Sequence, residues 1–366
     1  MPWKHELKNN LTTIEHLQEY VDLTRKERYL LNHVVARHPM SVTRYYLSLI
    51  DWDDPSDPIR KMAIPSLDEL SLRGSYDTSG EKERTKLPGL QHKYPQTALI
   101  LATNKCATYC RHCFRKRLVG LSTEEIIHNF SQAVKYIKSH PEINNVLITG
   151  GDPFMLETST IRKFLEKVSA IPHLDFIRFG TRIPVTFPMR IIEDEELQKV
   201  LTTYACGTKK IYIVTQFNHP TEITTQATEA VAVLSQAGTL ISNQTVLLKG
   251  VNDDPDTLAE LQNRLVNRGI IPYYVFQCRP VKRVKTQFQV PLYQGYTIVE
   301  EAKKKLNGHG KRFRYVMSHK TGKIEIIGIL NDDIVLKYHQ AEDVRKLGKI
   351  FTRKLDVNAG WLDDLQ

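Results

Sequence analysis

Three of the five cysteines in this 366-residue chain lie within one short loop, at Cys106, Cys110 and Cys113. Cysteine thiolates are soft ligands for iron and zinc, and three of them can hold three corners of a metal cluster while a fourth metal ion stays open. A structural zinc ion prefers four protein ligands, but the other two cysteines lie far from the loop and His112 is too tightly placed to chelate easily. The spacing C-x3-C-x2-C therefore favours an open-site cluster over structural zinc or inert thiols.

The loop resembles the signature of the radical SAM superfamily. The resemblance implies that Cys106, Cys110 and Cys113 hold a [4Fe-4S] cluster whose fourth iron binds the amino and carboxylate groups of S-adenosylmethionine (SAM). The signature usually has an aromatic residue before the third cysteine, and His112 fits that position beside the cofactor. An electron from a flavodoxin- or ferredoxin-type donor would then pass through the cluster and cleave SAM to methionine and a 5′-deoxyadenosyl radical, which abstracts hydrogen from an unactivated carbon.

Apolar runs and helix-like segments alternate along the chain and must position this loop. Six runs have the length of strands buried on both faces, at 98–102, 145–148, 176–179, 210–214, 240–248 and 272–277. Between them we expect helices at 122–140, where Ser122 and Glu125 make a capping box, at 221–237 and at 255–268. The alternation predicts an α/β fold in which a parallel sheet curls into a partial (βα)6 TIM-type barrel.

A glycine-rich segment follows the second predicted strand. In a barrel of this kind the chemistry lies at the carboxyl ends of the strands. Gly150 and Gly151 let backbone approach a ligand closely, and Asp152 can accept hydrogen bonds from an ammonium group. By itself Gly-Gly-Asp-Pro is typical of a turn. One repeat after the cysteine loop, it resembles the segment of the superfamily that binds the amino group of SAM.

Further stretches resemble the lysine 2,3-aminomutase (KamA) family, at 45–61, 180–185, 217–223 and 243–253, and with the cysteine loop they cover roughly residues 25 to 340. Characterised members use SAM, the cluster and pyridoxal 5′-phosphate (PLP) together to move an amino group from the α- to the β-carbon of an amino acid. The resemblance implies that Arg182 and Gln244 contact SAM. It also implies that Arg115 pairs with the substrate α-carboxylate, for which a fork-shaped guanidinium is suited.

The chain departs from this family at the PLP site. The family's glycine run before the PLP lysine is missing, and Lys323 is the nearest candidate for that lysine. A competing alignment matches the stretch 315–328 to a later strand, which would mean that the lysine-bearing loop is deleted. Both arginines that the family places near the phosphate are also missing from 92–97. Two enzyme interpretations therefore remain, an aminomutase with PLP and a PLP-independent radical SAM enzyme of another reaction class.

Substrate choice is a second departure. Lysine mutases have an aspartate after the sixth strand to pair with the substrate ε-ammonium, whereas this chain has Arg279. An arginine repels an ammonium group and attracts a carboxylate or phosphate, so we expect an acidic amino acid or another anionic small molecule rather than free lysine. The alternative is that Arg279 points to solvent with Lys282, Arg283 and Lys285. A third interpretation is a non-catalytic iron–sulfur protein. It is disfavoured because the motifs that resemble SAM-binding segments would then have no role.

Three regions are expected along the chain. Residues 1–95 are read as an N-terminal helical domain, with helices at 11–23, 26–36 and 43–50 and a polar surface loop or linker at 77–86. Residues 96–330 form the barrel, and 331–366 form a C-terminal extension whose role the sequence does not indicate.

The composition is that of a globular chain, with 41% hydrophobic residues, 25% charged residues and a formal net charge of +10. No run approaches the roughly 18 apolar residues of a membrane span, so we expect a cytoplasmic protein with no membrane partner. Nucleic acid is not an expected partner either, because no known binding module accompanies the basic runs. The C-terminal cysteine cluster that joins subunits in characterised family members is absent, which leaves a homo-oligomer open.

Overall fold

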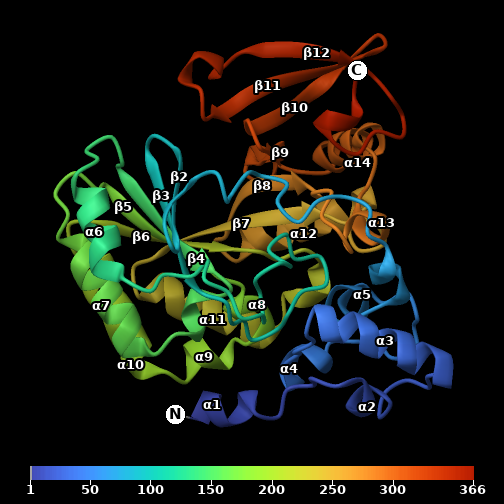
Figure 1. Ribbon diagram of the computed structural model, residues 1–366, viewed down its shortest axis with the longest axis horizontal. Helices are drawn as coiled ribbons and strands as arrows, with labels where there is room; N and C mark the ends of the chain where they lie inside the picture. The colour runs from blue at the N-terminus through green and yellow to red at the C-terminus, as the bar shows by residue number, and fades with distance from the viewer. Residues whose placement is uncertain (1) are drawn as a thin grey trace.

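The computed structural model describes residues 2–366, and its strands form one twelve-stranded sheet in chain order (Figure 1). Seven neighbouring strands run parallel: β3 (Thr97–Thr103), β4 (Asn145–Gly150), β5 (Phe176–Gly180), β6 (Lys210–Thr215), β7 (Leu240–Leu247), β8 (Ile271–Gln277) and β9 (Arg314–His319). Antiparallel strands continue both edges: β1 (Thr85–Leu87), β2 (Leu90–Tyr94), β10 (Gly322–Leu330), β11 (Asp333–Ala341) and β12 (Ile350–Lys354). Within residues 2–366 the two edge strands do not pair, so the predicted α/β fold with a partial barrel is confirmed.

Helices cover the outer face of the parallel strands (Figure 1). The longer ones are α6 (Phe130–Lys138), α7 (Thr158–Ser169), α10 (Glu195–Ala205), α11 (Thr225–Gln236), α12 (Pro255–Asn267) and α14 (Leu292–Lys304). Short helices are α8 (Ile183–Thr186), α9 (Met189–Ile192) and α13 (Lys285–Phe288), and 3-10 turns are η1 (Leu67–Leu70), η2 (Pro153–Met155), η3 (Pro220–Glu222), η4 (Gly310–Arg312), η5 (Val344–Lys346) and η6 (Leu362–Asp364).

All six predicted strands are present, and their register sets the position of the site. Val146 and Ile148 of β4 are fully buried on the face of the sheet that the helices cover, whereas Leu147 and Thr149 on the other face line a cavity. At the carboxyl end, Thr103 of β3 pairs with Gly150 of β4. The cysteine loop and the glycine segment therefore leave the sheet side by side. The seventh parallel strand, β9, is not among the six strands predicted from the apolar runs, although one family alignment matched residues 315–328 to a strand.

Two of the predicted helices begin later than expected. The first starts at Phe130 rather than at 122, and Asn129 caps it by accepting a hydrogen bond from the backbone nitrogen of Gln132 at 3.1 Å. The predicted capping box does not form because Glu125 instead accepts hydrogen bonds from Arg117, one of them at 2.6 Å. The helix expected at 221–237 starts at Thr225, after the turn η3. The helix predicted at 255–268 is confirmed by α12.

The N-terminal helices are α1 (Pro2–Leu7), α2 (Ile14–Leu17), α3 (Arg25–Arg37), α4 (Arg44–Leu47) and α5 (Pro58–Ala63), drawn in blue beside the barrel in Figure 1. The helix predicted at 26–36 is confirmed, whereas those at 11–23 and 43–50 are shorter than expected. A helical reading is wrong for residues 85–94, which form β1 and β2. Tyr46 of α4 and Met62 of α5 are fully buried in the same core as the barrel strands. The division into three domains stays a prediction.

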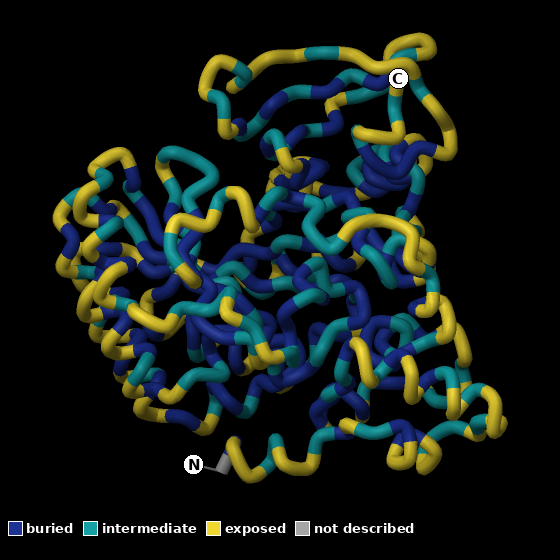
Figure 2. Tube along the Cα trace, viewed as in Figure 1, coloured by how far each residue is buried: buried dark blue, intermediate teal, exposed yellow. Residues whose placement is uncertain are grey.

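Residues 331–366 add β11, β12 and η6 to the far edge of the sheet. Trp361 and Leu336 are buried there in a second apolar core with β9 and β10. Figure 2 shows buried chain along the central strands and exposed chain on the outer helices and the last strands. Within residues 2–366, none of the helices combines the length and the apolar character that crossing a bilayer requires.

Candidate active site

A cavity of about 340 Å³ lies at the carboxyl ends of the parallel strands. Its lining includes every site residue predicted from the sequence: Cys106, Cys110, His112, Cys113, Arg115, Gly150, Gly151, Asp152, Arg182, Gln244, Arg279 and Lys323. These residues come from the loops after β3, β4, β5 and β8 and from strands β7 and β10. Because the strands end at one edge, residues more than 200 positions apart in the chain meet in one space.

A buried ion cluster fastens the cysteine loop to the N-terminal segment. Arg111, next to Cys110, donates hydrogen bonds from Nε and Nη2 to the two carboxylate oxygens of Glu69 at 2.8 and 2.6 Å. Nζ of Lys116 lies 2.6 Å from the same carboxylate, and Arg111 and Glu69 are both almost completely buried. Burial alone would raise the pKa of Glu69, but the charges of Arg111 and Lys116 outweigh it and lower that pKa to about 2. The loop is thus held by charged hydrogen bonds that flank its cysteines.

The three cysteines of the loop do not form the ligand set of a single metal ion in this structure. Among residues 2–366, no three histidine, cysteine or acidic side chains converge closely enough to hold one ion. Cluster cysteines each bind a different iron, so their sulfur atoms stand farther apart than the ligands of one ion. Burial, followed by the charges of neighbouring groups, raises the pKa of Cys106 well above its usual value and that of Cys113 to about 11. Iron would reverse this shift, because a coordinating thiol loses its proton.

The glycine segment is shaped by the cysteine loop itself. A Cβ atom on Gly151 would lie 2.4 Å from the carbonyl oxygen of Lys105, and one on Gly150 would lie 2.4 Å from that of Thr103. The backbone nitrogen of Gly151 donates to the Thr103 carbonyl at 2.6 Å. Only glycine leaves room for the two loops to pass this close to each other. The two glycines line the cavity, where a ligand is predicted to approach their backbone, and they also contact the loop that carries the cysteines.

Asp152 and His112 lie against the same wall. The carboxylate of Asp152 accepts hydrogen bonds from the Thr181 hydroxyl at 2.7 Å and from the backbone nitrogen of Arg182 at 2.6 Å, and burial raises its pKa to about 6. Asp152 therefore also fixes the loop after β5. His112 is buried with Nε2 3.3 Å from the side-chain nitrogen of Asn218, and its Nδ1 has no hydrogen-bond partner within residues 2–366. Burial lowers the pKa of His112 well below its usual value, so the ring is neutral.

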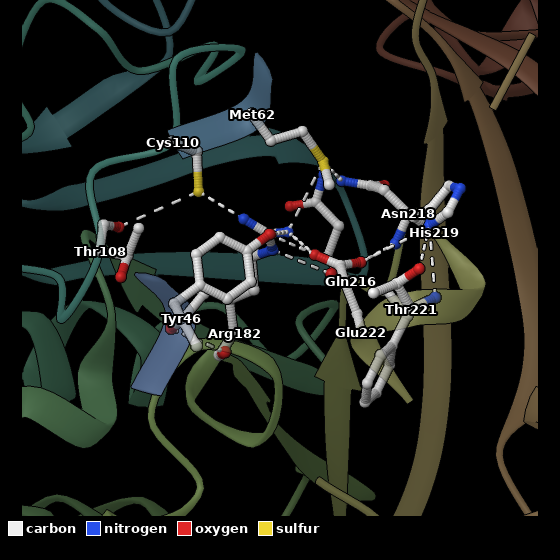
Figure 3. Close-up of polar contacts among 12 residues, drawn as sticks. Tyr46, Met62, Thr108, Cys110, Arg182, Gln216, Asn218, His219, Thr221 and Glu222 are labelled. Carbon is white, nitrogen blue, oxygen red and sulfur yellow. Dashed lines mark hydrogen bonds and ion pairs between the residues drawn. The ribbon is translucent and has the colours of Figure 1, made fainter. Parts of the chain in front are cut away.

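Arg182 makes the most extensive contacts of the site (Figure 3). Its Nη1 donates to Sγ of Cys110 at 2.7 Å and its Nε donates to the Gln216 carbonyl at 3.0 Å. Its Nη2 donates to the hydroxyl of Tyr46 at 3.1 Å and pairs with Glu222. The guanidinium thus joins a predicted metal ligand to two buried groups, one of them on the N-terminal helix α4.

Arg115 is paired with the carboxylate of Glu81, which belongs to the segment 77–86 that was predicted to be a surface loop or linker. Oε1 of Glu81 accepts hydrogen bonds from Nε and Nη2 of Arg115, and Oε2 accepts one from Nη2 of Arg117 at 2.7 Å. Glu81 is buried, so the prediction of an exposed linker at 77–86 is wrong at this position. Burial alone would raise its pKa, but Arg115, Arg117 and Arg279 together lower it to about 2. Three cations thus keep this carboxylate charged inside the protein.

Arg279 faces the cavity rather than solvent. Its guanidinium lies 4.1 Å from the ring centroid of Phe114, and its Nη1 donates to the hydroxyl of Ser79 at 2.8 Å. Burial lowers its pKa to about 10, which still leaves it charged at neutral pH. No carboxylate lies within ion-pair distance of Arg279 among residues 2–366. The alternative in which it points outward with Lys282 is wrong.

Lys323 lies at the far end of the cavity on β10, with Nζ 4.8 Å from the ring centroid of Tyr274. Its side chain is only partly exposed and lines the cavity. Burial, followed by the charges of Arg178, Arg279 and Lys93, lowers its pKa to about 7. The short turn between β9 and β10 places this lysine in the lining of the cavity that the cysteine loop also lines.

Several lining residues carry no motif and were missed. Glu81 and Lys93 belong to polar stretches that look solvated in the sequence, and Arg178 sits inside a strand. Tyr46 and Glu222 lie in stretches noted for their family resemblance, but nothing in their local sequence marks them as partners of Arg182. Their roles depend on contacts across more than thirty positions of chain.

Comparison with known proteins agrees with this geometry. Residues 100–261 match the radical SAM superfamily. A "Putative L-lysine 2,3-aminomutase" of Aquifex aeolicus (strain VF5) is 42% identical to this chain over 94% of its length and 92% of the relative. The L-lysine 2,3-aminomutase of Clostridium subterminale is 38% identical over 84% of this chain and 72% of the relative. The glutamate 2,3-aminomutase of Clostridioides difficile (strain 630) is 36% identical over 81% and 69%.

Membership of the superfamily implies that the cofactors include SAM and a [4Fe-4S] cluster, for which the three cysteines and the cavity beside them are suited. The long matches narrow the assignment further, since each covers more than four fifths of this chain. The chain belongs to the lysine 2,3-aminomutase family of the radical SAM superfamily and is an enzyme of the aminomutase type.

Proposed function

We propose that this enzyme is a PLP-dependent 2,3-aminomutase of an acidic α-amino acid and that Lys323 is its PLP-binding lysine. The observation that carries the proposal is the place of Lys323, which lines the same cavity as the three cysteines. A lysine must lose its proton before it can attack the aldehyde of PLP, and a pKa of about 7 makes that possible at neutral pH. The deleted-loop alignment offers no reason for a buried lysine at this position.

The surroundings of Lys323 fit the phosphate of PLP. Lys93 and Arg178 place two further cations at this end of the cavity. Nε of Arg178 and the side-chain nitrogen of Gln91 are buried donors without an acceptor among residues 2–366, which is costly unless an acceptor binds there. A phosphate supplies several acceptor oxygens. These groups can replace the two arginines that the chain lacks between 92 and 97.

The remaining cofactor roles follow the cavity wall. Cys106, Cys110 and Cys113 would hold the cluster, which supplies the electron that cleaves SAM. The SAM contacts would come from the other residues of that wall: His112, Gly150, Gly151, Asp152, Arg182 and Gln244. PLP, when bound, holds the migrating amino group and spreads the unpaired electron over its ring. The side chains of the protein orient the substrate, exclude water and bind the carboxylates of the substrate.

Two arginines support an acidic substrate. Arg115 keeps Nη1 beside the glycine segment, 3.4 Å from the carbonyl oxygen of Gly150, where it can meet an α-carboxylate close to SAM. Arg279 is a partly buried charge with no direct ion pair in the described chain, and it shares the nearby carboxylate of Glu81 with Arg115 and Arg117, so it can still pair with the second carboxylate of the substrate. A lysine ε-ammonium in that place would be repelled by the guanidinium of Arg279. The relative named as a glutamate mutase makes glutamate the first compound to try.

The test uses protein reconstituted with iron, sulfide and PLP without oxygen, reduced with borohydride and mapped by mass spectrometry. Borohydride converts a C=N bond between a lysine and PLP into a stable amine, so we expect one adduct, on Lys323. The variant Lys323→Gln should lose it, and the control Lys320→Gln, which alters an exposed lysine three residues away, should keep it. About four irons per chain with no specific adduct would instead indicate a PLP-independent radical SAM enzyme.

Substrate choice is tested with the same preparation plus SAM and a reductant. Glutamate and aspartate are compared with lysine, and the β-amino acid product is separated by chromatography. We expect product from an acidic amino acid and none above background from lysine. Efficient formation of β-lysine would overturn the substrate proposal and would leave the assignment of Lys323 standing.

A further inference from the structure

The guanidinium of Arg182 is enclosed by acceptors supplied by the protein (Figure 3). Its Nε, its Nη2 and one N–H of Nη1 are directed at the Gln216 carbonyl, at Tyr46 with Glu222, and at Sγ of Cys110. Arginine has five N–H groups, so one N–H on Nη1 has no acceptor within residues 2–366. Nearly all the freedom of this side chain is removed, and its fixed end points at a cysteine of the metal-binding loop.

Glu222 is the group that fixes it. The carboxylate is fully buried, and its Oε2 accepts hydrogen bonds from the backbone nitrogens of Asn218 and His219 at 2.6 and 3.1 Å. Its Oε1 accepts from the Tyr46 hydroxyl at 2.5 Å and from Arg182. The two backbone N–H groups fix the orientation of the Glu222 carboxylate, and the carboxylate in turn fixes the orientation of the Arg182 guanidinium. A buried ion pair with this many hydrogen bonds has one favoured geometry.

We propose that Glu222 is a positioning residue that holds Arg182 against Cys110, and that this contact raises the reduction potential of the cluster bound at Cys110. The proposal rests on the three cysteines holding the cluster, and it is independent of PLP and of the substrate. Hydrogen bonds to cluster sulfurs and nearby charge set the potentials of iron–sulfur clusters. Reduction from [4Fe-4S]2+ to [4Fe-4S]+ adds one electron, and a cationic donor on a ligand sulfur stabilises the more negative state.

Tyr46 extends this arrangement to the N-terminal helices. Its hydroxyl donates to Glu222 and accepts from Arg182, so it closes the contact from the side of α4. The aromatic ring is completely buried below the guanidinium, 5.5 Å from ring centroid to Cζ. The N-terminal segment therefore supplies part of the environment of the cluster, although it carries none of its ligands.

The experiment is a redox titration of the reconstituted full-length protein with titanium(III) citrate, followed by EPR of the [4Fe-4S]+ signal. The main variant is Glu222→Asp, which keeps the charge and withdraws the carboxylate by one methylene group. We expect its potential to fall below that of the wild type, in the same direction as Arg182→Gln. The control Glu229→Asp makes the same chemical change at an exposed position of α11 and should leave the potential unchanged.

A double variant separates positioning from a direct effect of Glu222. If Glu222 acts through Arg182, then Glu222→Asp should cause no further shift in an Arg182→Gln background. A wild-type potential in Glu222→Asp, or an equal additional shift in the double variant, would overturn the proposal. If Glu222→Asp does not retain iron, Tyr46→Phe provides the same test, because it removes one hydroxyl without changing any charge. Absence of a [4Fe-4S]+ signal in the wild type would instead contradict the cluster assignment itself.

Discussion

The carboxylate of Glu81 accepts hydrogen bonds from both Nε and Nη2 of Arg115, at 3.2 and 3.0 Å, deep inside the protein. This contact turns the remaining edge of Arg115, with Nη1, toward the glycine segment. The segment that carries Glu81 also contacts Arg279 and Lys93 through Ser79. A stretch whose composition suggested an exposed linker thus forms one wall of the cavity and sets the orientation of a predicted substrate contact.

Removing this carboxylate should destabilise the fold. The variant Glu81→Ala leaves Arg115 buried without a carboxylate partner and leaves Arg117 with Glu125 alone, and breaking a buried pair costs about 3–5 kcal/mol. We expect a loss of that size in the free energy of unfolding, measured by urea denaturation. Glu83→Ala, which removes an exposed carboxylate from the same segment, is the control. Equal stability of the two variants would contradict the buried ion pair.

Glu81 should also make stability depend on acid. Its pKa lies at about 2 in the folded protein against an ordinary 4.5, so the unfolded chain binds more protons between these values. The corresponding stabilisation is complete above about pH 4.5 and is lost as the pH falls toward 2; it amounts to on the order of 3 kcal/mol. Unfolding free energies between pH 6 and 3 should therefore fall more steeply in the wild type than in Glu81→Gln. Parallel pH profiles would argue against a charged Glu81.

Binding of PLP should follow the ionisation of Lys323. Its pKa of about 7 implies that the reactive neutral amine becomes the main form just above neutrality, whereas an ordinary lysine stays protonated to about pH 10.5. The rate at which added PLP becomes trappable by borohydride should rise between pH 6 and 8 and then level off. A rate that keeps rising tenfold per pH unit up to pH 10 would indicate a lysine with an ordinary pKa.

The sequence was informative where function depends on neighbours along the chain and silent where it depends on partners across the fold. The cysteine spacing and the apolar strands are local patterns, and both were predicted. Glu81 was missed because its burial results from Arg115 and Arg117, more than thirty residues later. The first half of one helix was wrong for a more local reason, because Glu125 pairs with Arg117, eight residues earlier, instead of capping a helix. For Lys323, the sequence allowed two alignments with the family, one in which it is the PLP lysine and one in which the lysine-bearing loop is deleted. The pairing of β9 with β10 is what puts its side chain in the cavity lining.

The two adjacent glycines offer a test of the cysteine loop. In Gly151→Ala the new Cβ would lie within 3 Å of three backbone atoms of Lys105, which cannot move without shifting the loop. We expect a cost of about 1–3 kcal/mol in stability and a clear drop in iron bound per chain after reconstitution. Gly308→Ala is the control, because a Cβ there meets nothing within 4 Å. If Gly151→Ala binds iron as well as the wild type, the crossing of the two loops is looser than the structure indicates.

Arg279 is the position where the substrate proposal can be tested most directly. In Arg279→Gln a side-chain carboxylate would lose a buried cationic partner, which costs at least about 2 kcal/mol, or about 30-fold in binding. We expect KM for an acidic substrate to rise by that factor or more, with a smaller change in kcat, because the contact is remote from the migrating amino group. Lys282→Gln removes the same charge three residues away and outside the cavity lining, so it should leave KM unchanged. An equal effect of the two substitutions would mean that the overall charge of the basic run, and not a contact with the substrate, attracts the anion.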